Sequence, residues 1–496
     1  MRAGTDRNWD LQNYQIFASF ALLHGRLFVD LAAGQMQGFF NPLLHLPWYL
    51  SRVALHEHPR AFAFLWGLPA GLVAYAFLRV AHLHASVLLR DARARLGAVA
   101  ATAAMGLTGA AFVPGIGLSS GDVWVTLPLL LAYSLILRET IRRDGEGAVR
   151  LPRLFGAGLL MGVATGLKLT TLPFSAAMGL MLLATLGLRP ALAAGAATMA
   201  GFLAAWLPHA TTLWQATGSP MFPLYNQVFR SPDYLEIPLI DARFLPRSAL
   251  QGVFYPFWWL DKTSSVVTEL EMRDWRLALA FTCWPVAAIL TTRGAARGMP
   301  RASWLLIGTC ALAYAAWAAL FGIYRYLVFL ELLAAILVLQ AMALLLRGRG
   351  PLVCGAVAVL AIIAVSTTVR PNWGLGRHGA SLLEIPSLPV PEGAAVMTTD
   401  SEPYGYLVPA LPRHAFMLGL RTNFSQPSQE HGLNRRIRAA IAAHEGALVV
   451  VHAPSDIAGR DATLAAHGLA LAGPCQLVRT SVVPDGHSFC PGRKLN

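Results

Sequence analysis

Long apolar runs separated by short polar segments make up most of the chain between residues 61 and 369. A helix needs roughly 20 apolar residues to cross a bilayer, and somewhat fewer where helices pack in a bundle. The pattern therefore predicts a polytopic α-helical membrane protein with about ten spans. The expected spans are 61–81, 95–113, 123–139, 154–168, 171–188, 190–207, 276–292, 303–322, 326–346 and 351–369.

The N-terminal 60 residues have a different pattern, since a polar opening segment, "DRNWDLQNYQIF", precedes short amphipathic stretches. Residues 14–29 are too polar to span a membrane. Their spacing favours a helix that lies in the membrane interface and buries Ile16, Phe17, Phe20 and Leu23. Residues 41–50, "NPLLHLPWYL", predict a second interfacial element.

The chain changes character again after residue 370, where apolar runs shorten to strand length, as in "GALVVVHAP" at 446–454. Residues 433–446 have helical spacing, and strands beside such a helix favour a small α/β domain. We therefore expect three parts: a first loop with interfacial helices (1–60), a helical bundle with a long loop at 208–275 (61–369), and a C-terminal α/β domain (370–496).

Composition and charge fit a membrane protein, with 55% hydrophobic and 13% charged residues and a mean hydropathy of +0.52. The net charge of +13 does not indicate nucleic-acid binding, because arginines gather in every second loop between spans. Basic loops stay in the cytoplasm. These arginines are Arg90, Arg93, Arg95, Arg138, Arg142, Arg143, Arg150, Arg153, Arg189, Arg293, Arg297, Arg301, Arg347 and Arg349.

The alternation places the remaining loops on the outer face, together with residues 1–60, the 208–275 loop and the C-terminal domain. An N-terminus on that face without a preceding span is hard to insert. We therefore expect one further helix upstream of residue 1, which would bring the bundle to about eleven helices and make the polar opening segment its first external loop.

Four charged residues share the predicted outer rim of the bundle: Asp10, Asp122, Lys168 and Arg325. Ionisable residues at membrane depth are costly and tend to be functional. The two cations suit a phosphate, and a carboxylate suits proton transfer from a hydroxyl. Each has a structural alternative: the two aspartates as helix N-caps, Lys168 as a snorkelling side chain and Arg325 as an interface anchor.

Further polar residues are candidates for substrate contacts. Asn13 lies close to Asp10 in sequence, and the aromatic- and proline-rich 208–275 loop contains Tyr225, Asn226 and Arg230. The stretch "FYPFWW" in this loop is more typical of an aromatic belt. Cys475 and Cys490 can pair if the C-terminal domain faces an oxidising compartment, and the sequence contains no Cys/His metal-ligand cluster.

These features together resemble the GT-C superfamily of integral membrane glycosyltransferases. The resemblance rests on the acidic "NWDLQNY" loop before interfacial helices, the acid in "SSGDV", the lysine in "GLKLT" and the C-terminal α/β domain; "NPLLHLPWYL" and "GSPMFPLYNQVFRSPDY" are similar to stretches of a bacterial branch. It implies inverting transfer of a sugar from a polyprenyl-phosphate donor to a glycan, lipid or protein acceptor at the periplasmic face of the inner membrane.

By the same resemblance, Asp10 would act as the base, and Lys168 and Arg325 would bind the departing lipid phosphate. Some members of the superfamily use a divalent metal, Mg²⁺ or Mn²⁺, for which Asp10 and Asp122 would be the ligands here.

Other functions remain open at the level of sequence. A flippase or transporter for lipid-linked sugars would share the phosphate-binding cations, but it predicts inverted repeats, which are not clear here. A non-catalytic envelope assembly protein predicts that Asp10 is dispensable. An O-antigen ligase or polymerase typically uses a large arginine-rich outer loop, and the 208–275 loop contains Arg230, Arg243, Arg247 and Arg273.

Overall fold

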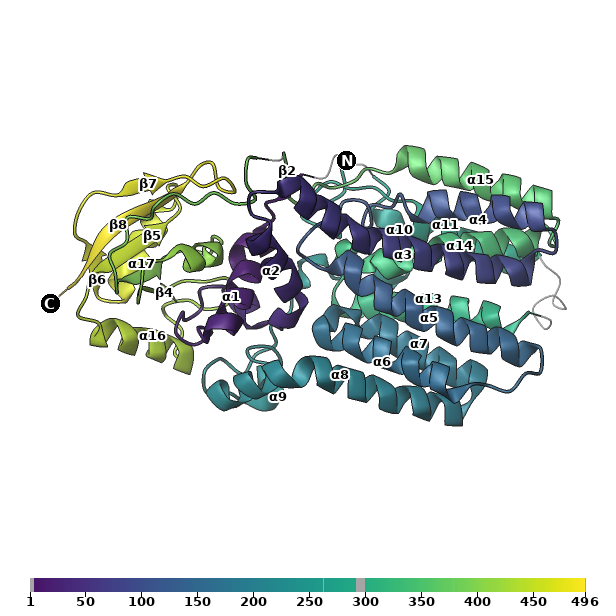
Figure 1. Cartoon of the computed structure of the whole chain (residues 1–496), viewed down its shortest axis with the longest axis horizontal. Coiled ribbons are helices and arrows are strands. Elements are labelled where there is room, and N and C mark those ends of the chain that lie inside the picture. The colour runs from purple at the N-terminus through teal and green to yellow at the C-terminus, as the bar shows by residue number, and fades with distance from the viewer. Residues whose placement is uncertain (1–3, 262, 291–298, 378, 496) are drawn as a thin grey trace.

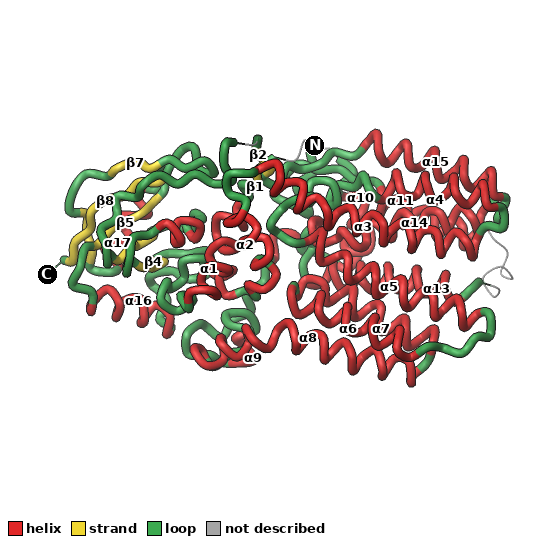
Figure 2. Tube along the Cα trace, viewed as in Figure 1, coloured by secondary structure: helices red, strands yellow, loops and turns green. Residues whose placement is uncertain are grey.

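The computed structural model describes residues 4–261, 263–290, 299–377 and 379–495. The molecule is elongated, with a helical bundle at one end and a mixed α/β domain at the other (Figure 1). The first two helices, α1 (Ile16–His24) and α2 (Leu46–Ala54), lie between these two parts. Figure 2 shows that the strands gather at the C-terminal end, except for the short pair β1 and β2 near the junction.

The expected spans coincide with the helices of the bundle. These are α3 (Pro59–Leu88), α4 (Ala92–Gly106), α5 (Asp122–Asp144), α6 (Leu151–Leu167), α7 (Leu172–Leu186), α8 (Leu188–Thr217), α11 (Arg276–Leu290), α13 (Arg301–Leu320), α14 (Val328–Leu345) and α15 (Gly350–Thr367). Within the described residues, 7 helical segments are long and apolar enough to cross a membrane, and α6 and α11 are shorter apolar helices. The chain is therefore a polytopic helical protein.

Two of the expected spans need comment. Residues 291–292 of the seventh span, like Arg293 and Arg297, lie outside the described residues. The second span was expected to run to residue 113, but α4 ends at Gly106 and an irregular loop follows. The loop leaves helical geometry because buried carboxylates of Asp274 and Glu331 accept its backbone N–H groups.

Two packing features organise the bundle. Helix α14 is apolar apart from Glu331 and Gln340 and is almost entirely buried, so it forms the centre of the bundle. Helices α6 and α8 pack closely along Gly158, Gly162 and Gly166, which lie one turn apart on α6. A Cβ atom at Gly162 would lie 2.0 Å from the Thr198 carbonyl oxygen, so only glycine permits this approach.

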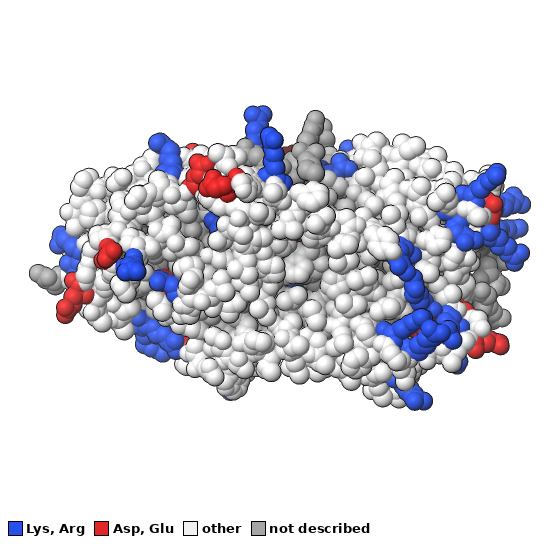
Figure 3. All heavy atoms as spheres, in the orientation of Figure 1, with Lys and Arg blue, Asp and Glu red and all other residues white. Residues whose placement is uncertain are grey.

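Lysine and arginine side chains gather at the end of the bundle remote from the α/β domain (Figure 3). This end carries the short connections α3–α4, α5–α6, α7–α8 and α14–α15. The C-terminal end of α5 also approaches the start of α13, where Arg301 Nη1 lies 3.3 Å from Asp144 Oδ1. The connections that the sequence analysis expects to be basic thus lie at one end of the bundle.

The C-terminal domain contains a 6-stranded sheet in the order β4–β3–β5–β8–β6, with β7 also paired to β8. Strands β3 (Ala395–Thr398), β4 (Phe416–Gly419) and β5 (Leu448–His452) are parallel. Strand β8 (His487–Lys494) is antiparallel to β5, β6 (Leu469–Leu471) and β7 (Gln476–Val478). Helices α16 (Gly432–Ala443) and α17 (Ile457–Ala466) complete the domain. A disulfide joins Cys475 to Cys490 on β8.

The N-terminal segment packs differently from the expected interfacial helix. Ile16 and Phe17 are buried in a hydrophobic cluster with Tyr404, Leu407 and other residues of the C-terminal domain, whereas Leu23, expected to be buried, is 48% exposed. Strand β1 (Thr5–Asp6) pairs with β2 (Leu375–Gly376), which connects the segment to the chain after α15. Part of the apolar surface of residues 4–60, including Ile16 and Phe17, is thus covered by the C-terminal domain.

Candidate functional site

The four charged residues expected at the rim come from four distant segments. Asp10 directly precedes a π-helical turn, Leu11–Gln15, and Asp122 is the first residue of α5. Lys168 follows α6, and Arg325 lies in the 3₁₀ turn Tyr324–Leu327 before α14. We call Asp10, Asp122, Lys168 and Arg325 the rim cluster.

The structure brings the rim cluster together as two ion pairs. Arg325 lies 2.7 Å from a carboxylate oxygen of Asp10, and Lys168 Nζ lies 2.5 Å from Asp122 Oδ1. Both cations approach the ring of Tyr326, at 5.4 Å for the Arg325 guanidinium and 5.3 Å for Lys168 Nζ. One aromatic ring therefore connects the two pairs.

The rim cluster retains unused hydrogen-bonding capacity. Among the described residues, Asp122 Oδ2 and Arg325 Nε are buried atoms without a hydrogen-bond partner, whereas Asp10 Oδ2 faces Arg325 in the ion pair. The Arg325 and Asp10 side chains remain 29% and 11% exposed. Buried polar atoms are normally paired, so unpaired atoms at a partly exposed charged site are bonding capacity available to a ligand.

The geometry also tests the structural alternatives for these residues. The N-cap function before the π-helical turn belongs to Asn8, whose Oδ1 accepts the N–H of Leu11 at 2.6 Å, and Asp10 makes no capping bond. Lys168 does not snorkel, because its ammonium donates to the Ser120 carbonyl oxygen at 2.8 Å and its side chain is 14% exposed. Gly121, with φ of 78°, is the N-cap of α5, so Asp122 lies in the first turn, where a negative charge is favourable.

A supporting layer fixes the loop before Asp122. Ser119 donates to Asp6 from its backbone N–H at 2.7 Å and from its hydroxyl at 2.6 Å. Burial raises the pKa of Asp6 to about 6, although these hydrogen bonds oppose the shift. The sequence analysis did not select Asp6 or Ser119; both flank selected residues, in "TDRNWD" and "SSGD".

His45 and Tyr14 complete this layer. His45 Nδ1 lies 3.1 Å from the Ser119 carbonyl oxygen, and burial lowers the pKa of His45 to about 3, helped by the positive charge of Lys168. The imidazole is therefore neutral and its Nδ1–H donates to that carbonyl. The Tyr14 ring meets His45 edge-on at 5.4 Å, and burial raises the pKa of Tyr14 well above its usual value.

The remaining predicted contacts lie elsewhere. Asn13 is fully buried and donates to Gln37 Oε1 at 3.2 Å, in a polar group that also includes Asn423. Asn226 begins the short helix α9 (Asn226–Phe229), and its side chain forms hydrogen bonds within its own loop. Its amide donates to the carbonyls of Ser231, Tyr234 and Leu235 and accepts the N–H of Ser231.

Tyr225 and Arg230, which flank α9, are also separate from the rim cluster. Tyr225 is 49% exposed, and Arg230 forms a loose surface pair with Glu236 at 3.8 Å. No described contact joins Tyr225, Asn226 or Arg230 to the rim cluster. The Asn226 side chain thus shapes its own loop, and the substrate contacts expected of Tyr225, Asn226 and Arg230 stay predictions.

Metal binding was tested on the same geometry. Asp10 and Asp122 each face a cationic side chain, and both ion pairs have to open before the two carboxylates can hold a divalent ion. In the described parts of the chain, the one grouping of three potential ligands is His452, Cys475 and Cys490, whose sulfurs form the disulfide. No metal enters the chemistry below.

A second buried charge group was missed by the sequence analysis. Asp274, Arg276 and Glu331 are fully buried, and we call them the core network. Arg276 pairs with Asp274 and donates to the Met105 carbonyl oxygen and the Thr108 and Thr368 hydroxyls. Glu331 accepts the N–H groups of Ala111 and Phe112 and the hydroxyl of Tyr324.

Comparison with known proteins adds no further assignment. No protein-family model, curated protein or solved structure matches the chain.

Proposed function

We propose that the protein transfers a sugar from a polyprenyl-phosphate-linked donor to a hydroxyl-bearing acceptor, as a GT-C-like membrane glycosyltransferase. The rim cluster carries this proposal: two cations and two carboxylates from four distant segments meet around Tyr326 at the bundle end that faces the α/β domain. A membrane setting is supported by the apolar helices.

Arg325 and Lys168 suit a leaving phosphate. Arg325 keeps an unused Nε donor, and an ammonium or guanidinium stabilises the charge that develops on the phosphate oxygen as the sugar departs. In the absence of a ligand the cations are held by Asp10 and Asp122, which keeps both in position.

The carboxylates suit the acceptor. When a phosphate takes up the Arg325 guanidinium, Asp10 loses its partner and is free to accept a proton. The acceptor oxygen then attacks the anomeric carbon, the carbon–oxygen bond to the phosphate breaks with its electron pair remaining on the phosphate, and the acceptor proton moves to Asp10. Attack opposite the leaving group inverts the anomeric centre.

The proposed location is the periplasmic face of a bacterial inner membrane, with the rim cluster and the α/β domain outside the cytoplasm. The gathering of basic side chains at the opposite end of the bundle supports this orientation (Figure 3). The Cys475–Cys490 disulfide supports an oxidising compartment. The remaining partners are the lipid bilayer and an acceptor glycan, lipid or protein; nucleic acid is not among them.

The test uses purified full-length protein and a panel of labelled polyprenyl-phosphate sugars, and it follows release of sugar from the lipid. Asp10→Asn keeps the shape of the side chain but removes the base, so we expect release to fall by about 10²–10⁴-fold. Asp461→Asn, an exposed acid on α17, is the control and should release sugar at the wild-type rate. Equal release by wild type and Asp10→Asn would refute the role of Asp10. Donor binding without release in any protein would instead favour transport or assembly.

A further inference from the structure

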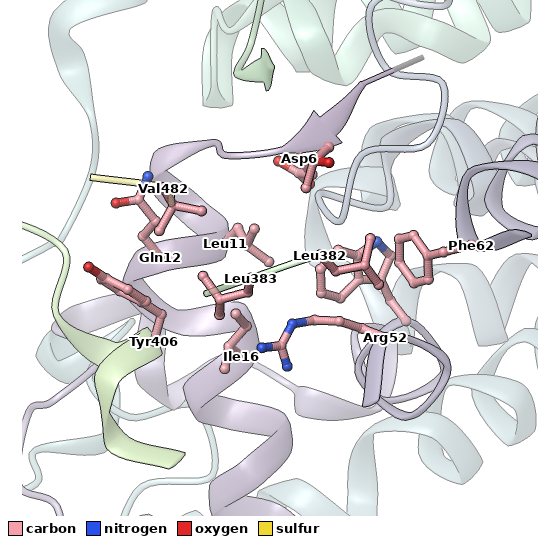
Figure 4. Close-up of a pocket in the computed structure, with 12 residues that line it drawn as sticks. Asp6, Leu11, Gln12, Ile16, Arg52, Phe62, Leu382, Leu383, Tyr406 and Val482 are labelled. Atoms are coloured by element: carbon pink, nitrogen blue, oxygen red, sulfur yellow. The ribbon is translucent and has the colours of Figure 1, made fainter. Parts of the chain in front are cut away.

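A small cavity lies between the N-terminal segment, α2 and the C-terminal domain (Figure 4). Asp6 of the supporting layer lines it, together with mainly apolar side chains such as Leu11, Ile16 and Leu382. Its volume of about 10 Å³ holds about one water molecule, so it has no room for a substrate. No member of the rim cluster lines this cavity, and further residues for the proposed reaction are therefore expected around the rim cluster itself.

Tyr326 is a neighbour that both cations of the rim cluster share. Lys168 Nζ lies 5.3 Å from the centre of the Tyr326 ring, and the Arg325 guanidinium lies 5.4 Å from it. Both distances are within the range in which the negative face of an aromatic ring attracts a cation. This attraction comes from the ring face, so it does not depend on the carboxylates that pair with the two cations.

The turn that carries Tyr326 is fixed from several sides. Phe321 meets the Tyr326 ring edge-on, with the two ring centres 5.8 Å apart. The Tyr324 N–H donates to the Val267 carbonyl oxygen at 2.8 Å, and the Tyr324 hydroxyl donates to Glu331 of the core network at 3.2 Å. The ring therefore has a fixed position before a ligand arrives, as preorganised stabilisation of charge requires.

A change of counter-ions is the step that such a ring assists. When the two cations leave their carboxylates for a phosphate, the repulsion between their positive charges is less compensated. The ring attracts both cations and offsets part of that repulsion. We propose that Tyr326 is a positioning residue, whose ring keeps Lys168 and Arg325 in place while they exchange the carboxylates for the lipid phosphate. This inference rests on the proposed function.

The test replaces Tyr326 in the full-length protein with phenylalanine and, in turn, with 4-fluoro-, 3,5-difluoro- and 3,4,5-trifluorophenylalanine. Fluorine atoms draw electron density from the ring face and change its shape little, so they weaken its attraction for a cation. Calorimetric titration in neutral detergent measures the Kd of farnesyl phosphate and of farnesol, its uncharged counterpart.

We expect Tyr326→Phe to bind farnesyl phosphate within about threefold of the wild-type affinity. The affinity should then fall with each fluorine, by about fivefold to thirtyfold in total, while the affinity for farnesol stays constant. A ring that acted only by filling space would not produce this series. The control places trifluorophenylalanine at Tyr75, whose ring lies 5.7 Å from Arg79 on α3, and should leave both affinities unchanged.

Two results would count against the account in different ways. The same affinity for farnesyl phosphate with phenylalanine and with trifluorophenylalanine at position 326 would overturn the positioning role of Tyr326 alone. Equal affinity of the wild-type protein for farnesyl phosphate and farnesol would instead contradict the proposed function, and the inference would fall with it.

Discussion

The rim cluster and the core network are both made of carboxylates paired with cations, yet they differ in how completely they are satisfied. In the core network, Asp274, Arg276 and Glu331 have no exposed surface, and backbone amides, a carbonyl and hydroxyls take up their bonding capacity. In the rim cluster, Asp10 and Arg325 are partly exposed, and Asp122 Oδ2 and Arg325 Nε have no hydrogen-bond partner in the described structure.

This difference separates structural charges from charges available to a ligand. A saturated buried network has no capacity left for a substrate, and its removal leaves uncompensated charge in the interior. A charged cluster with unpaired hydrogen-bonding atoms lowers the stability of the fold unless a bound ligand pairs those atoms. The core network also fixes the loop of residues 108–112, which leads toward Asp122.

The largest expected effect is on stability, from breaking the core network. Arg276→Met leaves Asp274 and Glu331 buried without their cation, so we expect the free energy of unfolding to fall by about 3–5 kcal/mol. Thermal unfolding of the purified protein measures the change. The control is Arg79→Met, which removes an arginine that bonds only to Tyr75 on an exposed part of α3. Similar melting temperatures for the two variants would show that the network is not structural.

A smaller loss of stability is expected from breaking the Lys168–Asp122 ion pair. Lys168→Met alone should cost about 1–3 kcal/mol of unfolding free energy, because Asp122 is left without its partner. The double variant Lys168→Met/Asp122→Asn should recover most of that loss, since a neutral pair needs no compensation. A double-mutant cycle of melting curves measures this coupling. Additive losses in the double variant would contradict it.

The smallest effect is a pH response from the layer behind the rim cluster. Because the folded pKa of His45 is about 3, below its usual 6.5, its contribution to stability is complete above pH 6.5 and is lost as pH falls toward 3. Asp6, with its pKa raised to about 6, acts in the opposite direction and contributes stability as pH falls below 6. His45→Asn keeps a donor for the Ser119 carbonyl oxygen but cannot titrate.

Unfolding measured at pH 7 and pH 5 should therefore show a smaller acid-induced loss in His45→Asn than in wild type. The difference should be about 1 kcal/mol per pH unit within the window. An identical loss in both proteins would exclude His45 as its source. Asp6→Asn is the matched variant of opposite sign and should lose more stability than wild type over the same interval.

Sequence patterns located the bundle helices because long apolar runs have few alternatives to spanning helices. They also selected the rim cluster, since charges at the ends of apolar runs are uncommon. Sequence patterns did not predict that Asp10 pairs with Arg325 and Lys168 with Asp122, because these pairs depend on four distant segments meeting in space.

Other features were missed for definite physical reasons. The apolar face of α1 predicts burial but does not specify what covers it, and the C-terminal domain covers Ile16 and Phe17 here. Loop 107–121 begins inside an expected span. Its backbone N–H groups donate to the carboxylates of Asp274 and Glu331, which are remote in sequence, instead of forming helical hydrogen bonds. Asn226 was selected for its polar type, but its amide is consumed within its own loop.

The central claim, that the free capacity of the rim cluster serves a lipid phosphate, is tested most directly by one binding comparison. The affinity of the purified protein is measured for a polyprenyl phosphate and for the polyprenyl alcohol of the same chain length. We expect the phosphate to bind about tenfold more tightly or better, and this preference to disappear in Lys168→Met and persist in Arg79→Met. Equal affinity for both lipids, or a preference that survives Lys168→Met, would contradict the account.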